Sequence, residues 1–515
     1  MKKFAKLLGY DPVEKQTNVK TEIIAGIVTF LAMAYILTVN PNQIVGSDSA
    51  YWASVFMATA IGAIIGTLLM AMVAKMPLAQ ASGMGLNSMV GGLVGGWTFF
   101  DTDGNGISFT VGQVFMLVFI SGIIFLALSV IKINGKTFRE LIFDGMPVSV
   151  RSAISVGIGL FIAYIGFQNA GIIVTNNFTQ VGFVDLTNWG DQIVNNGNMF
   201  FGEDPITLPA AKTALVAIIG LFLITILDNL KVKGSIIFGI LGATIVGIPF
   251  GVTNLEILAG EGGVSWKFWE SFGNFFAGGA EKSVFGSMFS VFEDGLIPDG
   301  VSVFSIIMLV ITLCIMDMFD TMGTIVGCCS SSPVLSDENG KPKNYSKIMI
   351  CDAVATCSGA AIGTSTVTTF VESGAGVSAG GRTGLTSFTT ACLFFLAMFA
   401  MPVFAVVPSA ATAAALIYVG VLMMKNNIKS VDFKNAINAT SAFLTISVMV
   451  LSYSITKGIG IGMVSYSVMT TLKYVIELIV SAVKKTEKPK WELSVVSIVV
   501  SVLFLIYFFV PATLF

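Results

Sequence analysis

Histidine is absent from the 515 residues of this chain. A proton carried within the protein must therefore ride on aspartate, glutamate or water, because the side chain that most often titrates near neutral pH is missing. The six cysteines lie in or beside apolar runs, and no histidine accompanies them at metal-ligand spacing. We expect them to be small buried hydrophobic side chains, and we expect no metal and no cofactor. Without histidine or a recognisable nucleophile–base pair, the chain is not expected to be an enzyme.

Charge is the second scarcity. Only 11% of the residues are charged, whereas 55% are hydrophobic. A soluble protein of this length needs charged side chains over most of its surface, and 28 basic plus 30 acidic residues are too few. The net charge of −2 offers nothing to nucleic acid. Composition therefore predicts an all-α polytopic membrane protein with the lipid bilayer around it.

Apolar runs recur along the chain, each long enough to cross about 30 Å of hydrocarbon. We expect no removable signal peptide, because the first run begins near Glu22 and looks like a span that is kept. An additional run at 491–513 either spans the membrane or lies along it. The fourteen predicted spans are 22–39, 52–74, 78–96, 108–131, 150–169, 212–229, 233–250, 301–326, 346–362, 364–382, 385–407, 408–424, 438–455 and 458–476.

The distribution of lysine and arginine predicts the orientation. With the N-terminus inside, 24 of the 28 basic residues fall on the cytoplasmic side. The four exceptions are Lys212, Lys267, Lys282 and Lys457. The long loops at about 170–211 and 251–300 fall outside, and they are acidic and rich in glycine and asparagine. The pattern predicts a multi-pass protein of the plasma (inner) membrane with a cytoplasmic N-terminus.

The count of spans also suggests an internal repeat. Seven spans precede the loop at 251–300, so the next seven start from the opposite side of the membrane, as in an inverted repeat. We therefore divide the chain into a first seven-span repeat with outer loops, an inverted second repeat and an additional hydrophobic segment. Their residues are 1–300, 301–490 and 491–515.

Two spans at matching positions of the two halves are poor lipid-facing helices. The third, from Met76 to Asn87, and the tenth, from Gly363 to Gly376, both open with an extended-looking stretch and then turn glycine-rich. Non-helical backbone at membrane depth survives only inside protein or beside a water-filled cavity, so such a pair points to a transporter binding site. Close helix packing through glycine and serine is the alternative. It does not explain the threonine run or the embedded Glu372.

Four acidic residues lie deep in predicted spans: Asp317, Asp320, Asp352 and Glu372. A carboxylate there is costly unless it is protonated, paired or hydrated, so the default interpretation is functional. Asp317 and Asp320 stand three residues apart on one side of a helix. Hydrogen bonding between helices is the alternative for this pair. Asp352 lacks close polar companions, and a pairing or capping role is as open as a transport role.

Two further residues lie in the third and tenth spans, which we call the broken segments because an extended stretch interrupts each of them. Glu372 precedes Ser373, where we expect a half-helix to begin whose backbone N–H groups would hold a carboxylate or a substrate oxygen. Asn87 follows the first glycine-rich stretch and offers both a donor and an acceptor. An interhelical hydrogen bond is an equally open interpretation of Asn87.

The chemistry of this set favours one kind of ligand. It has acids and amides, and no basic residue lies at comparable depth. Carboxylates accept hydrogen bonds from N–H groups, and Phe370 can stack on a flat ring. The set therefore favours a neutral, planar, N–H-bearing heterocycle over an inorganic anion. Because apolar surroundings favour the protonated carboxyl group, one of these acids is also a candidate carrier of a coupling proton.

Several motifs together resemble the nucleobase–ascorbate transporter superfamily, and most closely its purine permease branch, the adenine/guanine/hypoxanthine permeases. The resemblance covers nearly the whole chain to about residue 480. The motifs run from Asp317 to Thr324, from Gly363 to Glu372, from Gly380 to Gly384, from Thr21 to Leu37 and from Gly83 to Asn87. Between Glu372 and Arg382 the sequence departs from the superfamily signature by one inserted residue, which argues against uracil and ascorbate carriers.

The resemblance implies fourteen spans as a 7+7 inverted repeat, with a core domain (spans 1–4 and 8–11) and a gate domain (spans 5–7 and 12–14). Substrate would sit between short strands and half-helices of spans three and ten. Acids on spans eight and ten would hydrogen-bond the base, an aromatic would pack on its ring, and a third-span amide would contribute to purine recognition. The substrate-binding residues expected on this basis are Glu372, Asp320, Asp317, Asn87, Phe370, Thr369 and Ser373. The proton-coupling candidates are Glu372, Asp320, Asp317 and Asp352.

The expected function is import of purine nucleobases (hypoxanthine, adenine, guanine) by proton symport, with a rocking or elevator-type motion of core against gate. The main alternatives are a sulfate-type anion carrier and a xanthine or uracil carrier of the same fold. An anion site should favour cations or bare helix N-termini over several acids. A channel is a further alternative, which single acids on glycine-broken segments fit poorly. The preferred purine, H⁺ versus Na⁺ coupling and the oligomeric state, a homodimer included, stay open.

Overall fold

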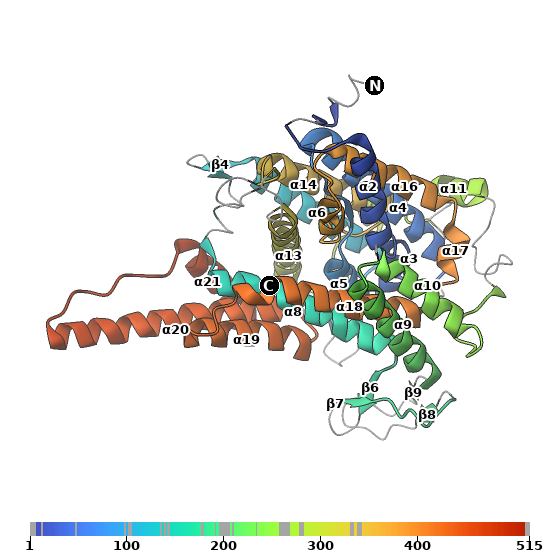
Figure 1. Ribbon diagram of the computed structural model, residues 1–515. Coiled ribbons are helices and arrows are strands. Elements are labelled where there is room, and N and C mark those ends of the chain that lie inside the picture. Colours follow the sequence, from blue (N-terminus) through green and yellow to red (C-terminus); the bar gives the residue numbers. More distant parts are fainter. Residues whose placement is uncertain are drawn as a thin grey trace.

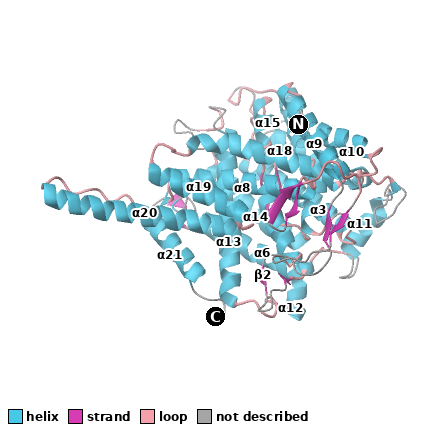
Figure 2. Cartoon of the chain, turned by 90° about the horizontal axis from the view of Figure 1, so that it is seen from below, coloured by secondary structure: helices cyan, strands magenta, loops and turns pink. Residues whose placement is uncertain are grey.

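Helices make up most of the chain, as the cyan ribbon of Figure 2 shows. The computed structural model describes residues 7–11, 14–46, 49–96, 99–100, 106–133, 136–137, 141, 145–176, 180–190, 192–194, 206–208, 211–232, 234–256, 268–277, 283–329, 334–336 and 342–509. Within these ranges, eight helices are long and apolar enough to cross a membrane. Shorter apolar helices accompany them. The fold is thus that of a polytopic membrane protein, while the count of fourteen spans and the inverted repeat stay predictions.

The helices follow the predicted apolar runs. Those of the first half are α2 (Val19–Met33), α3 (Ile36–Ile44), α4 (Trp52–Leu69), α5 (Met84–Val94), α6 (Val111–Val130), α8 (Val148–Asn169), α9 (Ala211–Asn229), α10 (Ser235–Gly247), α11 (Phe268–Ala277) and α12 (Val291–Asp294). Those of the second half are α13 (Val303–Cys329), α14 (Tyr345–Ile362), α15 (Ser373–Ser378), α16 (Gly384–Met398), α17 (Met401–Ala405), α18 (Ser409–Asn427), α19 (Ala436–Leu451), α20 (Ile455–Lys484) and α21 (Val495–Phe509). A π-helical turn, Met70–Ala74, extends α4, and 3-10 turns occur at Ser287–Ser290 and Ile428–Ser430.

Local sequence explains several helix starts. Asn18 accepts a hydrogen bond from the Thr21 N–H at 2.9 Å and so caps α2. Thr110 and Gln113 form a reciprocal capping box at α6. Because these polar side chains satisfy backbone N–H groups that would otherwise lack partners, they fix where the apolar helices begin.

The helices pack as two groups. In one, α8 packs against α18 and α19, α9 against α10 and α18, and α19 against α20. In the other, α14 packs against α6 and α4, α16 against α2 and α4, and α13 against α6. We call the first group the gate helices (α8–α10 and α18–α20) and the second the core helices (α2–α6 and α13–α16), names that here describe packing alone. The groups meet where α10 contacts α2, α5 and α13 contact α8, and α18 contacts α3.

Two short strands from distant parts of the sequence pair inside the core helices. β1 (Gln80–Ser82) and β10 (Val367–Thr369) run antiparallel, with Gln80 opposite Thr369 and Ser82 opposite Val367. Both strands are fully buried. They occupy the extended-looking stretches predicted in the third and tenth spans, and a short helix follows each, α5 after β1 and α15 after β10.

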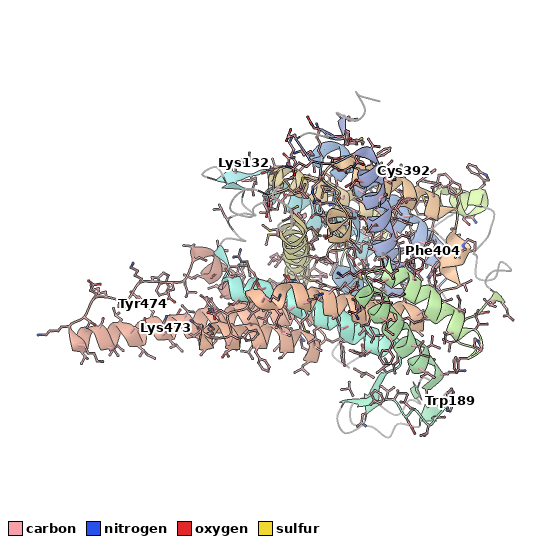
Figure 3. The ribbon with its side chains drawn as sticks, in the orientation of Figure 1. Lys132, Trp189, Cys392, Phe404, Lys473 and Tyr474 are labelled. Atoms are coloured by element: carbon pink, nitrogen blue, oxygen red, sulfur yellow. The ribbon has the colours of Figure 1, made fainter. Side chains whose placement is uncertain are left out.

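The other strands form hairpins in connecting segments. They pair as β2 (Phe99–Phe100) with β3 (Gly106–Ile107), β4 (Lys132–Ile133) with β5 (Lys136–Thr137), β6 (Ile173–Asn176) with β7 (Gln180–Phe183), and β8 (Gln192–Val194) with β9 (Ile206–Leu208). In Figures 1 and 3, Lys132 of β4 lies toward the upper left and Trp189, between β7 and β8, toward the lower right. The two residues thus lie far apart in this view. Which side faces the cytoplasm stays a prediction.

The C-terminal helices form an arm. The 30-residue α20 projects beyond the rest of the molecule in both views (Figures 1 and 2), and Lys473 and Tyr474 mark this part in Figure 3. The chain then returns to α21, which packs on α20 through the Ser467 and Ser501 hydroxyls, 2.7 Å apart. The additional apolar run at 491–513 is therefore helical over its described part, and whether it spans the membrane stays open.

Candidate functional site

The strand pair depends on its surroundings, because two strands of three residues are too short to be stable alone. Asp352 of α14 supplies one support. Its Oδ1 accepts hydrogen bonds from Gln80 Nε2 at 2.8 Å and from the Thr369 hydroxyl at 3.2 Å. Its Oδ2 accepts one from Thr321 of α13 at 2.7 Å. One fully buried carboxylate thus ties together β1, β10 and α13.

Asp317 and Asp320 of α13 have different surroundings, although they stand on one side of the helix. The Asp317 Oδ2 accepts a hydrogen bond from Thr356 of α14 at 3.0 Å, and Thr356 also lies 3.2 Å from the Val367 carbonyl oxygen of β10. Asp317 is buried behind the strands, whereas Asp320 is only half-buried. Asp320 lies within electrostatic range of Asp352, and also of Glu372 and Tyr35. Asp320 therefore lies close to the pair formed by Tyr35 and Glu372.

Glu372 sits between β10 and α15, where it is the residue preceding the first turn of that short helix. Its Oε1 accepts a hydrogen bond from the Tyr35 hydroxyl at 2.6 Å. Its Oε2 is buried and has no hydrogen-bond partner among the described residues. The Glu372 side chain as a whole is 6% exposed. One carboxylate oxygen is thus held in place, and the other is open to a donor that the described residues do not supply.

Tyr35 is the site residue that the sequence analysis missed. It lies at the break between α2 and α3, is 2% exposed, and its hydroxyl also lies 3.5 Å from Met84 Sδ at the start of α5. A tyrosine in an apolar run usually indicates packing alone. The available signal was that a buried tyrosine hydroxyl needs a partner, and a deep glutamate is one.

Asn87 and Ser373 are bonded inside the protein. Asn87 is fully buried, its Oδ1 accepts hydrogen bonds from the Ser82 and Ser365 hydroxyls, and its Nδ2 lies 3.4 Å from the Ser82 carbonyl oxygen. The Ser373 hydroxyl accepts from the Ala79 N–H at 3.0 Å. These side chains shape the backbone on either side of the strand pair. Direct contact of either with substrate stays a prediction.

Phe370 and Thr369 complete the predicted set. The Phe370 N–H donates to the Ala79 carbonyl at 3.0 Å and extends the β1–β10 ladder by one residue. Its ring is 4% exposed and belongs to the main hydrophobic cluster. Thr369 is 1% exposed and turns its hydroxyl toward Asp352. The Thr369 hydroxyl is therefore bonded to Asp352 of α14. Glu372, Tyr35 and Asp320 instead lie close together where β10 ends.

A second buried glutamate was also missed. Glu22 of α2 is fully buried and accepts hydrogen bonds from the Arg382 N–H at 2.9 Å and the Thr386 hydroxyl at 2.6 Å. The Arg382 guanidinium donates to the carbonyl oxygens of Val377 and Gly381. Glu22 therefore holds the start of α16 and Arg382 the end of α15, and both act on the frame around the broken segment.

Glu372 and Asp320 have no basic partner among the described residues. Within the part of the chain that the structure describes, neither Glu372 nor Asp320 forms an ion pair with a lysine or arginine, and the ion pairs present lie near the chain ends and on the α20 arm. A buried carboxylate is stable when protonated, hydrated or hydrogen-bonded by a ligand. The arrangement can therefore accept hydrogen bonds from a neutral N–H-bearing molecule and can take up a proton.

The fold and this buried polar centre together define a polytopic membrane transport protein. The chain belongs to the family described as the permease family, whose model matches residues 20–190 and 192–461. It is a transporter and not an enzyme.

Relatives with assigned names cover most of the chain. The guanine/hypoxanthine permease PbuO of Bacillus subtilis is 32% identical over 500 residues, 96% of this chain and 99% of that protein. The guanine/hypoxanthine permease PbuG of the same species is 33% identical over 473 residues, 89% and 92% of the two chains. The adenine permease AdeQ of Escherichia coli is 32% identical over 459 residues, 88% of each.

Solved structures show the same fold at low sequence identity. The transmembrane domain of the cyanobacterial bicarbonate transporter BicA matches with a TM-score of 0.55 and 16% identity, over 85% of this chain and 97% of that one. SLC26A9 matches with a TM-score of 0.52 and 11% identity, over 91% and 67% of the two chains. At such identities the likeness speaks for the fold alone.

Proposed function

We propose that this protein imports purine nucleobases (hypoxanthine, adenine or guanine) across the plasma membrane as a secondary active transporter. The observation that carries the proposal is the Glu372 carboxylate. Tyr35 fixes one of its oxygens at 2.6 Å while the other, buried Oε2 has no partner among the described residues. A purine presents ring N–H groups that fit this acceptor. The names of the adenine and guanine/hypoxanthine permeases cited above support the same substrate class.

In the proposed complex the base lies at the end of β10. Glu372 accepts a ring N–H, and Asp320 accepts a second N–H from the side of α13. Phe370 packs on the ring face. The strand pair is supported by the side chains of Asp317, Asp352 and Thr369, which form hydrogen bonds with α13, α14 and the strands. This assignment chooses Asp320 over Asp317 as the substrate-binding aspartate.

The proposed coupling ion is H⁺. In this chain without histidine, the carriers available near the base are carboxyl groups. Glu372 and Asp320 lack a cationic partner among the described residues, so protonation of one of them would remove a buried charge before the site moves. Coupled loading of base and proton follows if the base binds only one protonation state. Na⁺ is the competing coupling ion.

The proposed motion moves the core helices against the gate helices. β1, β10, α13 and α14 are bonded to one another, so the base would travel with the core helices as one body. A rocking or elevator-type displacement of the two groups would then open the site to each side in turn. In this proposal the N-terminus is cytoplasmic.

An anion carrier is the second candidate, because solved structures of this fold include a bicarbonate transporter and an anion transporter. Buried acids oppose it, since an anion beside Glu372 and Asp320 would face like charges. Uptake of radiolabelled hypoxanthine, adenine, guanine and xanthine, with sulfate and bicarbonate for comparison, separates the candidates. Purine uptake that collapses with a proton uncoupler and is indifferent to Na⁺ supports the proposal. Uptake of sulfate or bicarbonate without any purine refutes it.

A further inference from the structure

A cavity outside this site lies where one core helix meets two gate helices. It is lined by residues of α3 and the turn after it, by the last residue of α8 and by the first two turns of α18. Its described lining shares no residue with the candidate site. The cavity measures about 210 Å³. That is below the range of roughly 300–1000 Å³ for drug-sized pockets, and it suits a molecule of one or two rings.

The side-chain amide of Asn42 is fixed in this lining. The Trp52 indole N–H donates to Asn42 Oδ1 at 2.6 Å. An indole N–H can only donate, so the atom facing it must be the amide oxygen. The amide nitrogen Nδ2 is therefore the other end, and it is buried with no hydrogen-bond partner among the described residues. Asn42 thus holds an unused donor at the cavity.

Gln43 is fixed in the opposite sense. Its Nε2 donates to the Ser88 hydroxyl oxygen at 3.1 Å. The Ser88 proton is already directed to the Met84 carbonyl at 3.2 Å, so Ser88 must accept from Gln43. The remaining Gln43 atom, Oε1, is buried without a partner among the described residues. Gln43 thus holds an unused acceptor.

The cavity therefore presents a donor and an acceptor on two anchored amides, together with the side chains of Asn169, Ser409 and Thr412. Buried polar atoms normally have hydrogen-bond partners. The two atoms of this cavity without partners among the described residues, Asn42 Nδ2 and Gln43 Oε1, therefore indicate a ligand that offers an acceptor to the first and a donor to the second. The described lining residues carry no charge, which favours a neutral ligand. A nucleobase edge, with adjacent N–H and carbonyl or ring-nitrogen groups, has this complementarity.

We propose that this cavity is a second binding site for the transported base, which the base occupies between the outer solution and the strand pair. The proposal rests on the proposed function and on the predicted orientation, which places the ends of α3 and α8 and the start of α18 at the outer side. Because the lining comes from both helix groups, the site exists in full only while core and gate helices hold this arrangement. A base bound here would enter the central site when the groups move.

The test labels a cysteine at the cavity. Ser409 is exposed, so Ser409→Cys should react with a membrane-impermeant maleimide added outside, and hypoxanthine should slow the reaction. At about four times its dissociation constant, a bound ligand slows labelling about fivefold. Leu186→Cys is the matched control, because it is exposed in the segment after β7 and away from the cavity. The chain without an added cysteine gives the background from native thiols.

The decisive arm repeats the labelling with Glu372→Gln present, which disables the central site. Protection of Ser409→Cys that persists supports a separate site. Protection that disappears with Glu372, equal protection of Leu186→Cys, or a Ser409→Cys thiol that does not react from outside each overturns the proposal. A cavity filled by water alone gives labelling that hypoxanthine does not change, and this result overturns the proposal as well.

A kinetic arm keeps the two proposals apart. Gln43→Leu should raise the KM for hypoxanthine about fivefold, the effect of one neutral hydrogen bond, and leave the maximal rate unchanged. Asn427→Leu, at the opposite end of α18 with its amide on the Met423 carbonyl, should leave KM unchanged. If the unaltered chain imports no purine, the proposed function has failed. If it imports purines and Gln43→Leu leaves KM unchanged, only the second site has failed.

Discussion

At the scale of single residues, the chemistry depends on which carboxylate oxygens already accept hydrogen bonds from the protein. The Glu372 Oε1 is held by Tyr35, and the Asp352 oxygens are held by Gln80, Thr369 and Thr321. Both acids are buried to a similar degree. Only the first offers a second oxygen without a protein partner among the described residues. For these two acids, burial alone does not separate the proposed binding carboxylate from the structural one, whereas their hydrogen bonds do.

Glu372→Gln should abolish concentrative purine uptake while the protein still reaches the membrane. The amide keeps the shape and can still accept the Tyr35 hydroxyl, but it cannot exchange a proton, and its NH₂ opposes a purine N–H. Uptake in membrane vesicles with an imposed pH gradient, normalised to the amount of protein, measures the effect. Normal accumulation by this variant would remove Glu372 from the mechanism.

Tyr35→Phe should weaken purine uptake without abolishing it. It removes the 2.6 Å hydrogen bond that orients Glu372, and bonds to charged groups contribute about 1.5–3 kcal/mol. We expect KM to rise by about tenfold or more. Tyr466→Phe on α20 is the control, because it removes a hydroxyl from a partly buried tyrosine outside the site. Equal effects of the two changes would show that Tyr35 has no special part.

We expect Asp320→Asn to impair uptake and Asp317→Asn to impair folding stability. Asp320 is half-buried near Glu372, so Asp320→Asn should lose uptake and keep its thermal stability. Asp317 is 1% exposed and accepts from Thr356, so Asp317→Asn should lower the free energy of unfolding by about 1–3 kcal/mol. Uptake assays and melting curves on the purified variants measure both. The reverse pattern would make Asp317 the substrate-binding aspartate.

At the scale of elements, the broken segments show what a sequence can and cannot predict. The extended stretches before Asn87 and Glu372 were visible because threonine runs and glycines suit a helix in lipid poorly, and β1 and β10 occupy them. That Gln80 pairs with Thr369 was not visible, since single strands of three residues carry no register signal. Tyr35 was missed because its hydroxyl partner is 337 residues away in the sequence.

The close fit of the strand pair against α4 yields a prediction at this scale. A Cβ at Gly66 would lie 2.9 Å from both Gln80 Oε1 and Val367 Cγ1. Gly66→Ala should therefore push the strands from α4, cost about 1–3 kcal/mol of stability and reduce uptake. The methyl group added by Gly273→Ala in α11 meets nothing within 4 Å, so this variant should keep its stability and its uptake.

A compensating change tests this explanation. Val367→Ala removes one of the two groups that the new methyl meets, so it should restore part of the uptake lost in Gly66→Ala. Melting temperature and uptake of the single and double variants measure the coupling. Purely additive losses would show that the strand pair does not bear on α4 at this point.

At the scale of the whole molecule, the packing predicts which parts move together. Polar bonds join β1, β10, α13 and α14, so these elements form one body around the site. The gate helices pack mainly among themselves through α8 and α18. The sequence alone indicated neither group, since membership came from the family resemblance and the packing from the structure.

A cross-link between the groups should therefore stop transport, whereas one within a group should not. A Cβ at Gly85 of α5 would lie 3.0 Å from Ile158 Cγ2 of α8, across the core–gate boundary. One at Gly220 of α9 would lie 3.1 Å from the Ala414 Cβ of α18, within the gate helices. The Gly220–Ala414 spacing joins two Cβ atoms and suits a disulfide, whose Cβ atoms stand about 3.5–4.5 Å apart, after a small shift. At Gly85 the neighbouring atom is one bond beyond the Ile158 Cβ, so this pair is also close enough for a cross-link. Oxidised Gly85→Cys/Ile158→Cys should lose hypoxanthine uptake and regain it in reductant, while oxidised Gly220→Cys/Ala414→Cys keeps it. Undiminished uptake by the oxidised core–gate pair, with the cross-link verified by mass spectrometry, would show that the two groups need not separate at this contact.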